Sequence, residues 1–564
     1  MSNPTVTVVI GAYNAMPYLT RCLESVVQQE PGAHTFECLA VDDGSTDGTG
    51  EELDRFAAAH PDLVRVVHQP NSGGPSGPRN RAIGLARGRY VFFLDADDHL
   101  GPGALRRMTD MAERNDSDVV LGKYVGVDCV VPRSMFDANQ EVVDLATSRV
   151  WYALTPHKLF RRSFLLERKL RFDEDIRVGE DRLFVTKAYL QASVISVVAD
   201  EDCYYKVGRD DNGNITSNYT DVMKRFEVAR RIMTAIGELS EPGPVRQAAL
   251  SRTFRGGLLD SFSWRFPRLT EDEQLKAMAI AKKYVDAWLT PELEAGLSAP
   301  LRVFAHCARH GLRRELVAVI DFLTAERDGH RPPHDIVVDA GRAYAAYPYF
   351  RDERAGIPDS CYDVTDDLRQ DDRLDAVEWR RAGRRGVLRL RGHGLIEGVP
   401  LRDPATEVVL IARSGGREVR VPVAPAAAPG LPKGAGFTAD IDITRAPYGE
   451  PLTPGVWDVY LDVRTRGLST RRRYGARKAE GMAPAVGGGS GGLEVKPYFT
   501  AYGNLSLEIT SVAEERRPRG LERRVRRRLK GLGRRVTSRR LRRMARLRSS
   551  SAASRRRGSR GPHA

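Results

Sequence analysis

The sequence predicts an α/β protein in three folded parts: a largely parallel sheet covered by helices on both faces, a helical domain, and an antiparallel β-sandwich. Three observations support this. Short apolar runs alternate with helical patterns up to about residue 215, apolar residues then recur every three to four positions to about 327, and a period of two follows from about 367 to 510. A chain of 564 residues also exceeds what one hydrophobic core normally supports.

The N-terminal part contains five apolar runs that read as buried strands. They are Val6–Ile10, Phe36–Val41, Leu63–His68, Tyr90–Leu94 and Val119–Leu121. Four helical patterns lie between them, at Ala15–Gln29, Gly48–Ala59, Asn80–Ala86 and Pro102–Asn115. Strands that alternate with helices are typical of a parallel sheet that is buried on both faces.

The rest of the chain divides by its hydrophobic period. Segments such as Glu271–Leu289 and Leu301–Thr324 predict a helical domain, which Arg331-Pro332-Pro333 ends. Alternating strands between glycine and proline turns then predict the sandwich, and Gly487–Gly492 predicts a flexible loop or linker. We place the boundaries at 1–217 for the first domain, 218–330 for the helical domain, 331–366 for a linker, 367–512 for the sandwich and 513–564 for a tail.

The net charge of +14 belongs to the tail. From Arg516 onward there are 21 Arg and Lys and one acidic residue, a charge of +20, so the rest of the chain carries about −6. Between Leu521 and Leu547 apolar residues recur every three or four positions among the arginines, as in a helix on an anionic membrane surface. A grip on a phosphate polymer, nonspecific nucleic-acid binding and a solubilising tail are the alternatives. We expect no nucleic-acid partner, because the body is acidic and no aromatic residues interleave the arginines.

The cysteines and the N-terminus indicate where the protein works. Six cysteines are scattered without a CxxC or Cys/His cluster, which predicts free thiols in a reducing compartment. The apolar run after the N-terminus is too short for a signal peptide, and no stretch approaches 18 apolar residues. We therefore expect a cytoplasmic protein, peripheral at the inner face of the cell membrane.

Polar residues follow the predicted strands of the first domain, at the edge where parallel sheets bind ligands. Tyr13 after the first strand can stack on a base, and Asp43 after the second can accept a hydrogen bond from a uracil. A turn and helix cap is the alternative for the Asp-Gly-Ser-Thr-Asp segment. A glycine-rich loop, Asn71–Asn80, then carries Arg79, which can meet a phosphate or a carboxylate.

The strand Tyr90–Leu94 runs into Asp95-Ala96-Asp97-Asp98. Three carboxylates within four residues repel one another unless a cation lies among them, and oxygen ligands next to a diphosphate suit Mg²⁺ or Mn²⁺. A solvated acidic turn is the alternative. Further along, Glu180-Asp181 supplies either a general base or the acidic first turn of a helix, and the residues alone do not choose between them.

Taken in order over roughly the first 215 residues, these motifs resemble the inverting family 2 glycosyltransferases, which have a Rossmann-like GT-A fold. The resemblance implies that Asp181 deprotonates the acceptor and that Asp95 and Asp97 hold a divalent metal, Mn²⁺ or Mg²⁺, with the diphosphate. It also implies a nucleotide-sugar site, whose residues would be Ala12, Tyr13, Asp43, Asn71, Arg79, Asp95, Ala96 and Glu180.

The order of domains resembles the wall teichoic acid glycosyltransferases, which decorate polyol-phosphate polymers and can oligomerise through their sandwich domains. This resemblance implies transfer of N-acetylglucosamine or another hexose from a UDP-sugar, a polyanionic or glycan acceptor, and a dimer or trimer. Lys206 and Arg209 are the candidate acceptor-binding residues, with solvated positions as the alternative. A capsule or exopolysaccharide transferase and a non-catalytic glycan-binding scaffold are the competing functions.

Overall fold

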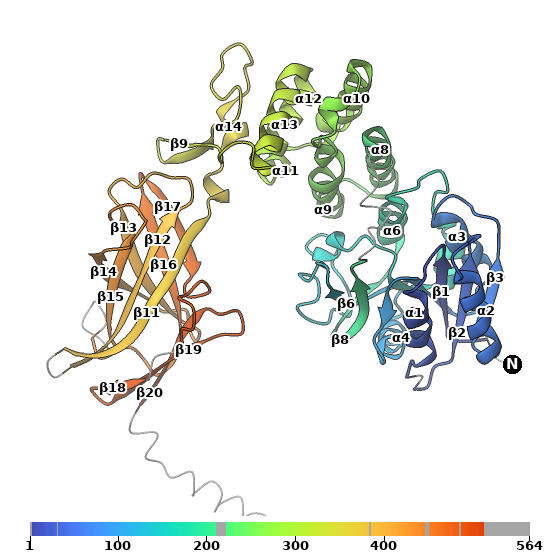
Figure 1. Cartoon of the computed structure of the whole chain (residues 1–564), viewed down its shortest axis with the longest axis horizontal. Coiled ribbons are helices and arrows are strands. Elements are labelled where there is room, and N and C mark those ends of the chain that lie inside the picture. The colour runs from blue at the N-terminus through green and yellow to red at the C-terminus, as the bar shows by residue number, and fades with distance from the viewer. Residues whose placement is uncertain are drawn as a thin grey trace, which may run out of the picture. The chain divides into compact units, whose positions relative to one another are not determined.

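A computed structural model describes residues 3–30, 32–209, 221–382, 385–445, 451–483 and 487–511. The chain forms two compact units (Figure 1). The first comprises residues 1–334 and 345–364, and the second comprises 335–344 and the chain from residue 365 onward. The chain therefore leaves the first unit, contributes ten residues to the second and returns. The predicted tail lies outside the described residues.

The first unit is built on an eight-stranded sheet with the order β3-β2-β1-β4-β7-β6-β8-β5. The strands are β1 (Val6–Ala12), β2 (Phe36–Asp42), β3 (Val64–His68), β4 (Tyr90–Asp95), β5 (His99–Leu100), β6 (Val119–Val127), β7 (Lys158–Arg161) and β8 (Ile195–Val207). Strands β3, β2, β1 and β4 are parallel, and β7 is antiparallel to both of its neighbours. The prediction of a largely parallel sheet is confirmed, with β7 and the short edge strand β5 running antiparallel to their neighbours.

The helices around this sheet are α1 (Leu19–Val27), α2 (Thr49–Ala59), α3 (Ser76–Leu85), α4 (Ala104–Asn115), η1 (Arg149–Tyr152), α5 (Arg162–Glu167) and α6 (Glu180–Gln191). Four of them, α1 to α4, lie near the predicted segments, and η1, α5 and α6 were not among the predicted helices. Helix α3 packs on β1 and β2, and α4 packs on β6 and β8. Helix α3 starts four residues before the prediction, inside the glycine-rich loop, so Arg79 lies on a helix and is buried.

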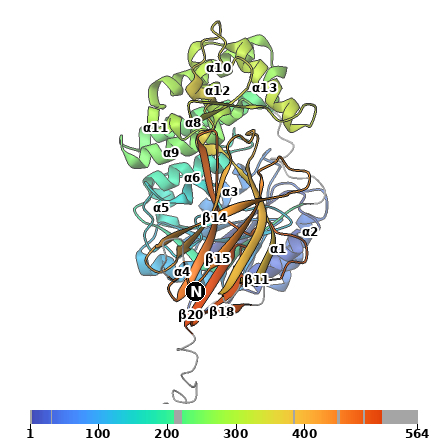
Figure 2. The same cartoon turned by 90° about the vertical axis from the view of Figure 1, so that its left-hand side faces the viewer.

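The helical part packs on α6 through α8 and belongs to the same unit (Figure 2). Its elements are α8 (Val222–Leu239), α9 (Pro244–Thr253), η2 (Phe254–Leu258), η3 (Leu259–Ser261), η4 (Phe266–Arg268), α10 (Glu271–Trp288), α11 (Pro291–Ala295), α12 (Ala299–His310), α13 (Arg313–Arg327) and α14 (Asp359–Tyr362). The apolar pattern at 301–324 spans two helices, because Gly311 adopts a left-handed φ of 72° between them. Within the described residues, no helix is both long and apolar enough to cross a bilayer.

The second unit is a ten-stranded antiparallel sheet that folds back on itself. Its main path is β11-β12-β15-β14-β13-β16-β20-β19-β18, and β17 pairs with β16. The strands are β11 (Gln370–Ala382), β12 (Arg385–Ile396), β13 (Ala405–Ala412), β14 (Glu418–Ala426), β15 (Gly436–Asp442), β16 (Gly455–Thr465), β17 (Leu468–Arg473), β18 (Gly488–Ser490), β19 (Leu493–Phe499) and β20 (Leu505–Ser511). A separate hairpin joins β9 (Ile336–Asp339) to β10 (Arg342–Ala345), and η5 (Thr365–Asp367) precedes β11.

Strand β14 links the two halves of this sheet, because it pairs with β15 on one side and β13 on the other. The halves pack face to face: a Cβ atom added at Gly394 in β12 would lie 2.6 Å from the Leu461 side chain in β16. The predicted antiparallel sandwich is therefore confirmed, and its two layers are halves of one continuous sheet. The segment predicted as a flexible loop or linker forms strand β18 and its turn, since the glycines leave room for Trp379, whose ring lies 2.1 Å from a Cβ built at Gly488.

Candidate active site

The carboxyl ends of β1, β2 and β4 meet at one edge of the sheet. The register places Ala12 beside Asp42 and Gly11 beside Asp95. Ala12 is buried in the sheet, whereas Tyr13, directly after it, is 52% exposed. The edge therefore presents one accessible aromatic ring beside two acidic loops, as expected for a site that binds a base and a diphosphate.

Arg79 joins two acidic segments that are far apart in the sequence. Its guanidinium donates to Asp95 Oδ1 over 2.8 Å and to Glu180 Oε1 over 3.0 Å, and it lies 5.2 Å from the ring centre of Phe172. Despite its burial, the Asp95 and Glu180 carboxylates raise the pKa of Arg79. Arg79 thus meets carboxylates in this structure, one of the two kinds of partner that the sequence predicted.

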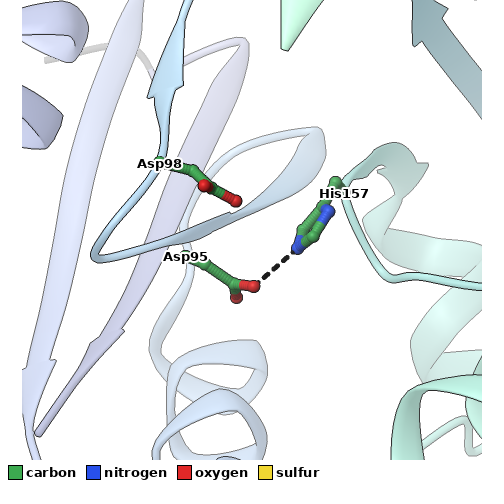
Figure 3. A group of neighbouring side chains, drawn as sticks. All are labelled: Asp95, Asp98 and His157. Atoms are coloured by element: carbon green, nitrogen blue, oxygen red, sulfur yellow. Dashed lines mark hydrogen bonds and ion pairs between the residues drawn. The ribbon is translucent and has the colours of Figure 1, made fainter. Parts of the chain in front are cut away.

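Asp95, Asp98 and His157 form the one group of acidic and histidine side chains, among the described residues, that could hold a metal ion (Figure 3). One ligand atom from each lies within 4.8 Å of the others. His157 Nε2 is 2.8 Å from Asp95 Oδ2, and its ring stacks on Tyr204 at 4.2 Å between ring centres. The Tyr204 hydroxyl in turn donates to Asp98 over 2.5 Å. Aromatic stacking therefore positions the imidazole against the acidic turn.

Asp97, the predicted partner of Asp95 in metal binding, is not part of that group. Its carboxylate lies 3.7 Å from the Arg209 guanidinium, and burial together with repulsion from Asp95 raises its pKa. Burial and the charges of Asp95 and Asp97 also raise the pKa of Asp98 to about 8. The turn thus concentrates more negative charge than its neighbours neutralise, which is the electrostatic setting of a cation site.

Asp43 is 2% exposed, and the following loop occupies its carboxylate. Gln69 Nε2 donates to Oδ1 over 2.6 Å, and the Ser72 hydroxyl donates to Oδ2 over 2.8 Å. The neighbouring Asn71 is exposed and accepts a hydrogen bond from the Gly73 N–H. Asp43 and Asn71 therefore lie in one loop system beside Tyr13, where the resemblance places the nucleoside.

Glu180 and Asp181 begin helix α6 but lie in different environments. Glu180 is buried and tied to Arg79, and burial with repulsion from Asp181 raises its pKa to about 7. Asp181 is half-buried and accepts a hydrogen bond from the Arg182 N–H over 2.7 Å. Of the two carboxylates, Asp181 is thus the one that can reach an acceptor.

Arg182 directly follows Asp181, and the Arg252 guanidinium lies near that of Arg182. Burial and the neighbouring Arg252 guanidinium lower the pKa of Arg182 to about 10. The Nε atoms of both arginines are buried and lack a hydrogen-bond partner among the described residues. A π-helical turn, η2, makes room for them: Cβ atoms at Gly256 and Gly257 would lie 1.8 Å from Arg252 Nη1 and 2.8 Å from Arg182 Nη2.

The predicted acceptor residues Lys206 and Arg209 lie in different surroundings. Lys206 is exposed near the end of β8. Arg209 lies 4.9 Å above the Tyr18 ring and faces Asp97. Arg209 therefore contacts the acidic turn, and its role in acceptor binding stays a prediction.

Three family models match successive parts of the chain: glycosyl transferase family 2 at residues 7–184, the TarS linker domain at 224–320, and the TarS β-glycosyltransferase C-terminal domain 1 at 368–509. The poly(ribitol-phosphate) β-N-acetylglucosaminyltransferase TarP of Staphylococcus aureus is 30% identical over 236 residues, which cover 41% of this chain and 72% of TarP. The chain belongs to glycosyltransferase family 2.

Two longer matches show that the similarity of this family 2 glycosyltransferase to known proteins also covers its second unit. The poly(ribitol-phosphate) β-glucosyltransferase of Bacillus spizizenii is 28% identical over 518 residues, which cover 89% of this chain and 78% of the relative. The crystal structure of S. aureus TarS covers 90% of this chain and 85% of TarS at 23% identity and a TM-score of 0.59, which shows the shared fold. A TarS 1–349 structure in complex with UDP-GlcNAc covers 61% and 97%, at 29% identity and a TM-score of 0.52.

Sequence reasoning on this family 2 glycosyltransferase missed His157, Arg182 and Tyr204. A single histidine before a four-residue strand has no spacing that marks it as part of a site. Tyr204 lies in β8, whose centre is charged and gives no apolar run. Arg182 directly follows the candidate base, and that adjacency was the one signal that could have identified it.

Proposed function

We propose that this family 2 glycosyltransferase transfers glucose or N-acetylglucosamine from a UDP-sugar to a hydroxyl of a polyol-phosphate polymer of the cell envelope. The observation that carries the proposal is the half-buried Asp181 carboxylate next to Arg182, whose guanidinium in turn lies near that of Arg252. A base next to arginines whose buried Nε atoms have no hydrogen-bond partner among the described residues suits an acceptor that offers both a hydroxyl and a phosphate. The S. aureus and B. spizizenii relatives are named for poly(ribitol-phosphate) acceptors.

The second unit favours this acceptor over a capsule or exopolysaccharide repeat. The succinoglycan biosynthesis protein ExoO of Rhizobium meliloti matches 33% of this chain, whereas the B. spizizenii relative matches 89%. The match to a TarS C-terminal domain at residues 368–509 supports the same choice.

For the donor, we assign the nucleoside to the loops around Tyr13, Asp43 and Asn71, and the diphosphate to the turn at Asp95 and Asp97. The carboxylates of this turn suit a divalent cation, because burial and mutual repulsion raise the pKa of both Asp97 and Asp98. Asp95 would hold the ion with Asp97, as the resemblance implies, or with Asp98 and His157, whose ligand atoms lie within 4.8 Å of one of its oxygens. A bound divalent ion supplies charge neutralisation for the departing diphosphate.

For the chemistry, Asp181 accepts the proton of the acceptor hydroxyl while that oxygen attacks the anomeric carbon. Glu180 is unsuited to this role because Arg79 holds it in a buried ion pair. Arg182 and Arg252 orient the acceptor phosphate next to the hydroxyl. A single displacement inverts the anomeric centre, so an α-linked donor gives a β-linked product, as in the names of the β-transferases among the relatives.

For its location, we propose that the enzyme works at the inner face of the cell membrane. The six cysteines are free thiols, which suits a reducing compartment. The basic amphipathic tail would bind the anionic lipid surface, a proposal that rests on sequence alone. We also propose that the second unit supports a homo-oligomer.

The test is metal-dependent donor hydrolysis followed by transfer. The full chain would be incubated with UDP-, GDP- and CDP-sugars, with Mn²⁺, Mg²⁺ or EDTA, and free nucleoside diphosphate would be measured. We expect release from one UDP-sugar, abolished by EDTA, reduced about 100-fold or more in Asp97→Ala, and unchanged in the exposed control Asp62→Ala. Poly(ribitol phosphate) should then be glycosylated. Full activity in EDTA would contradict the metal assignment, and the absence of both release and nucleotide binding would contradict the enzyme.

A further inference from the structure

Away from the transfer site, Trp264 in the helical part lies among three arginines. The guanidinium carbons of Arg265 and Arg268 are 4.2 and 4.4 Å from its ring centre, and that of Arg327 is 5.9 Å away. Arg327 is neutralised by Asp328, with 2.8 Å between Nε and Oδ1. Within the part of the chain that the structure describes, neither Arg265 nor Arg268 forms a side-chain ion pair or hydrogen bond. Two like charges therefore share one indole without a carboxylate between them.

The turn that carries these arginines is held in place by a buried phenylalanine and by hydrogen bonds from helix α10. Phe266 is fully buried and packs edge-on against Phe262, with 5.1 Å between ring centres. The side-chain amide of Gln274 in α10 lies within 3.1–3.3 Å of three backbone carbonyls of the turn. Because the backbone is already ordered, a ligand that binds there loses little chain entropy.

The chemistry of this surface suits a phosphodiester chain. Guanidinium groups that stack on an aromatic ring keep their N–H groups available in the guanidinium plane, where they can pair with phosphate oxygens. Single carboxylate ligands would meet the same groups, but a polymer with repeated phosphates satisfies both arginines at once. A nucleic acid is disfavoured, because one aromatic ring offers no series of stacking positions and the body of the protein is acidic.

This surface lies on the same stretch of chain as the acceptor arginines. Trp264 follows Arg252 by twelve residues, so a fully extended connection could span no more than about 40 Å. A polymer of many repeats can span any separation up to that limit and so can occupy both sites at once.

We propose that Trp264, Arg265 and Arg268 form an accessory binding site for the phosphodiester backbone of a polymeric acceptor, distinct from the transfer site at Asp181. The inference rests on the proposed function for the nature of the acceptor. Such a site raises the local concentration of acceptor ends and hydroxyls at Asp181 without contacting the reacting sugar.

The experiment compares Arg265→Gln/Arg268→Gln with Arg114→Gln/Arg314→Gln, which removes the same charge at two exposed positions of the same unit. Binding of poly(ribitol phosphate) to the full chain is measured directly over a range of salt concentrations, independently of turnover. We expect at least a fivefold loss of affinity and a salt slope lower by about two in the first variant only. Trp264→Ala should also weaken binding, although it leaves the charge unchanged.

Turnover separates this inference from the proposed function. The first variant should show a higher KM for the long polymer, with unchanged kcat, unchanged KM for a one-repeat acceptor and unchanged donor hydrolysis. Equal polymer affinity in the two double variants would overturn the accessory site while leaving the transferase intact. Tighter binding of a single-stranded RNA of equal charge than of the polymer would overturn the assignment of its ligand, and failure of the wild type to bind the polymer would overturn both.

Discussion

Replacing Arg79 by methionine tests whether its buried bridge holds the active site together. The change keeps most of the side-chain volume and removes two charge-assisted hydrogen bonds, at 2.8 and 3.0 Å. Each such bond contributes about 1.5–3 kcal/mol, and breaking a buried pair typically costs about 3–5 kcal/mol. The Asp95 side chain is 34% exposed, so solvent offsets part of its loss. We expect Arg79→Met to lower the free energy of unfolding of the first unit by about 3 kcal/mol at pH 8.

The loss should shrink as the pH falls, and the sign follows from Glu180. Its pKa of about 7 in the folded protein lies above the value of about 4.3 in an unfolded chain. Protonation therefore favours the folded state, and this contribution is lost as the pH rises through 7. Without Arg79 the pKa of Glu180 rises further. Between pH 6 and pH 8 the wild type therefore ionises Glu180 within its ion pair more readily than the variant does, and the variant is closer in stability to the wild type at pH 6.

Amide hydrogen exchange of the peptides from α3 and β4, read by mass spectrometry on the full chain, measures the stability of this unit by itself. Arg81→Met, two residues away on an exposed position of the same helix, is the matched control and should change stability by less than about 0.5 kcal/mol. A difference of under about 1 kcal/mol between the two variants at pH 8, or a larger loss at pH 6 than at pH 8, would refute the reasoning.

Three further outcomes follow from the site. Asp181→Asn should lower kcat by about 100- to 10,000-fold with unchanged binding of UDP and unchanged Tm, and near-normal turnover would remove it as the base. The pKa of Asp98 is raised to about 8, so its protonated form stabilises the fold and this contribution is lost as the pH rises. Asparagine resembles the protonated form at every pH. In EDTA, the Tm of Asp98→Asn should therefore increase relative to the Tm of the wild type between pH 5 and pH 9. Gly256→Ala should displace Arg252 and raise the KM for the polymer without changing donor hydrolysis, whereas Gly84→Ala, which has open space around it, should do neither.

The positions of the first strands and of the motifs along the chain could be predicted because both are marked by local sequence. Apolar runs such as Tyr90–Leu94 mark strands that are buried on both faces, and the acidic turn follows directly. The predicted edge then brings Ala12, Asp42 and Asp95 together through the register of parallel strands. These features needed no knowledge of distant contacts.

The strand and the side chains that reach this edge from distant parts of the sequence could not be predicted, because long-range packing determines which they are. Strand β7 is four residues long and begins with Lys158, a lysine that is fully buried under Tyr124 and Tyr189, so its sequence reads as a polar loop. The bridge from Arg79 to Glu180 joins residues 101 positions apart. Burial of a charge whose partner is so distant leaves no periodic trace in the sequence.

The way the chain crosses between its two units limits where it can be cut. A fragment that stops at the Arg331-Pro332-Pro333 break would omit α14, whose Cys361 and Tyr362 are buried and which packs on α12. It would also expose the Arg302 guanidinium, which donates to the Asp363 carbonyl. A fragment that ends after Val364 keeps these contacts but carries the β9–β10 hairpin away from the sheet with which it is grouped. Either cut therefore removes contacts that the intact chain makes within one of its two units.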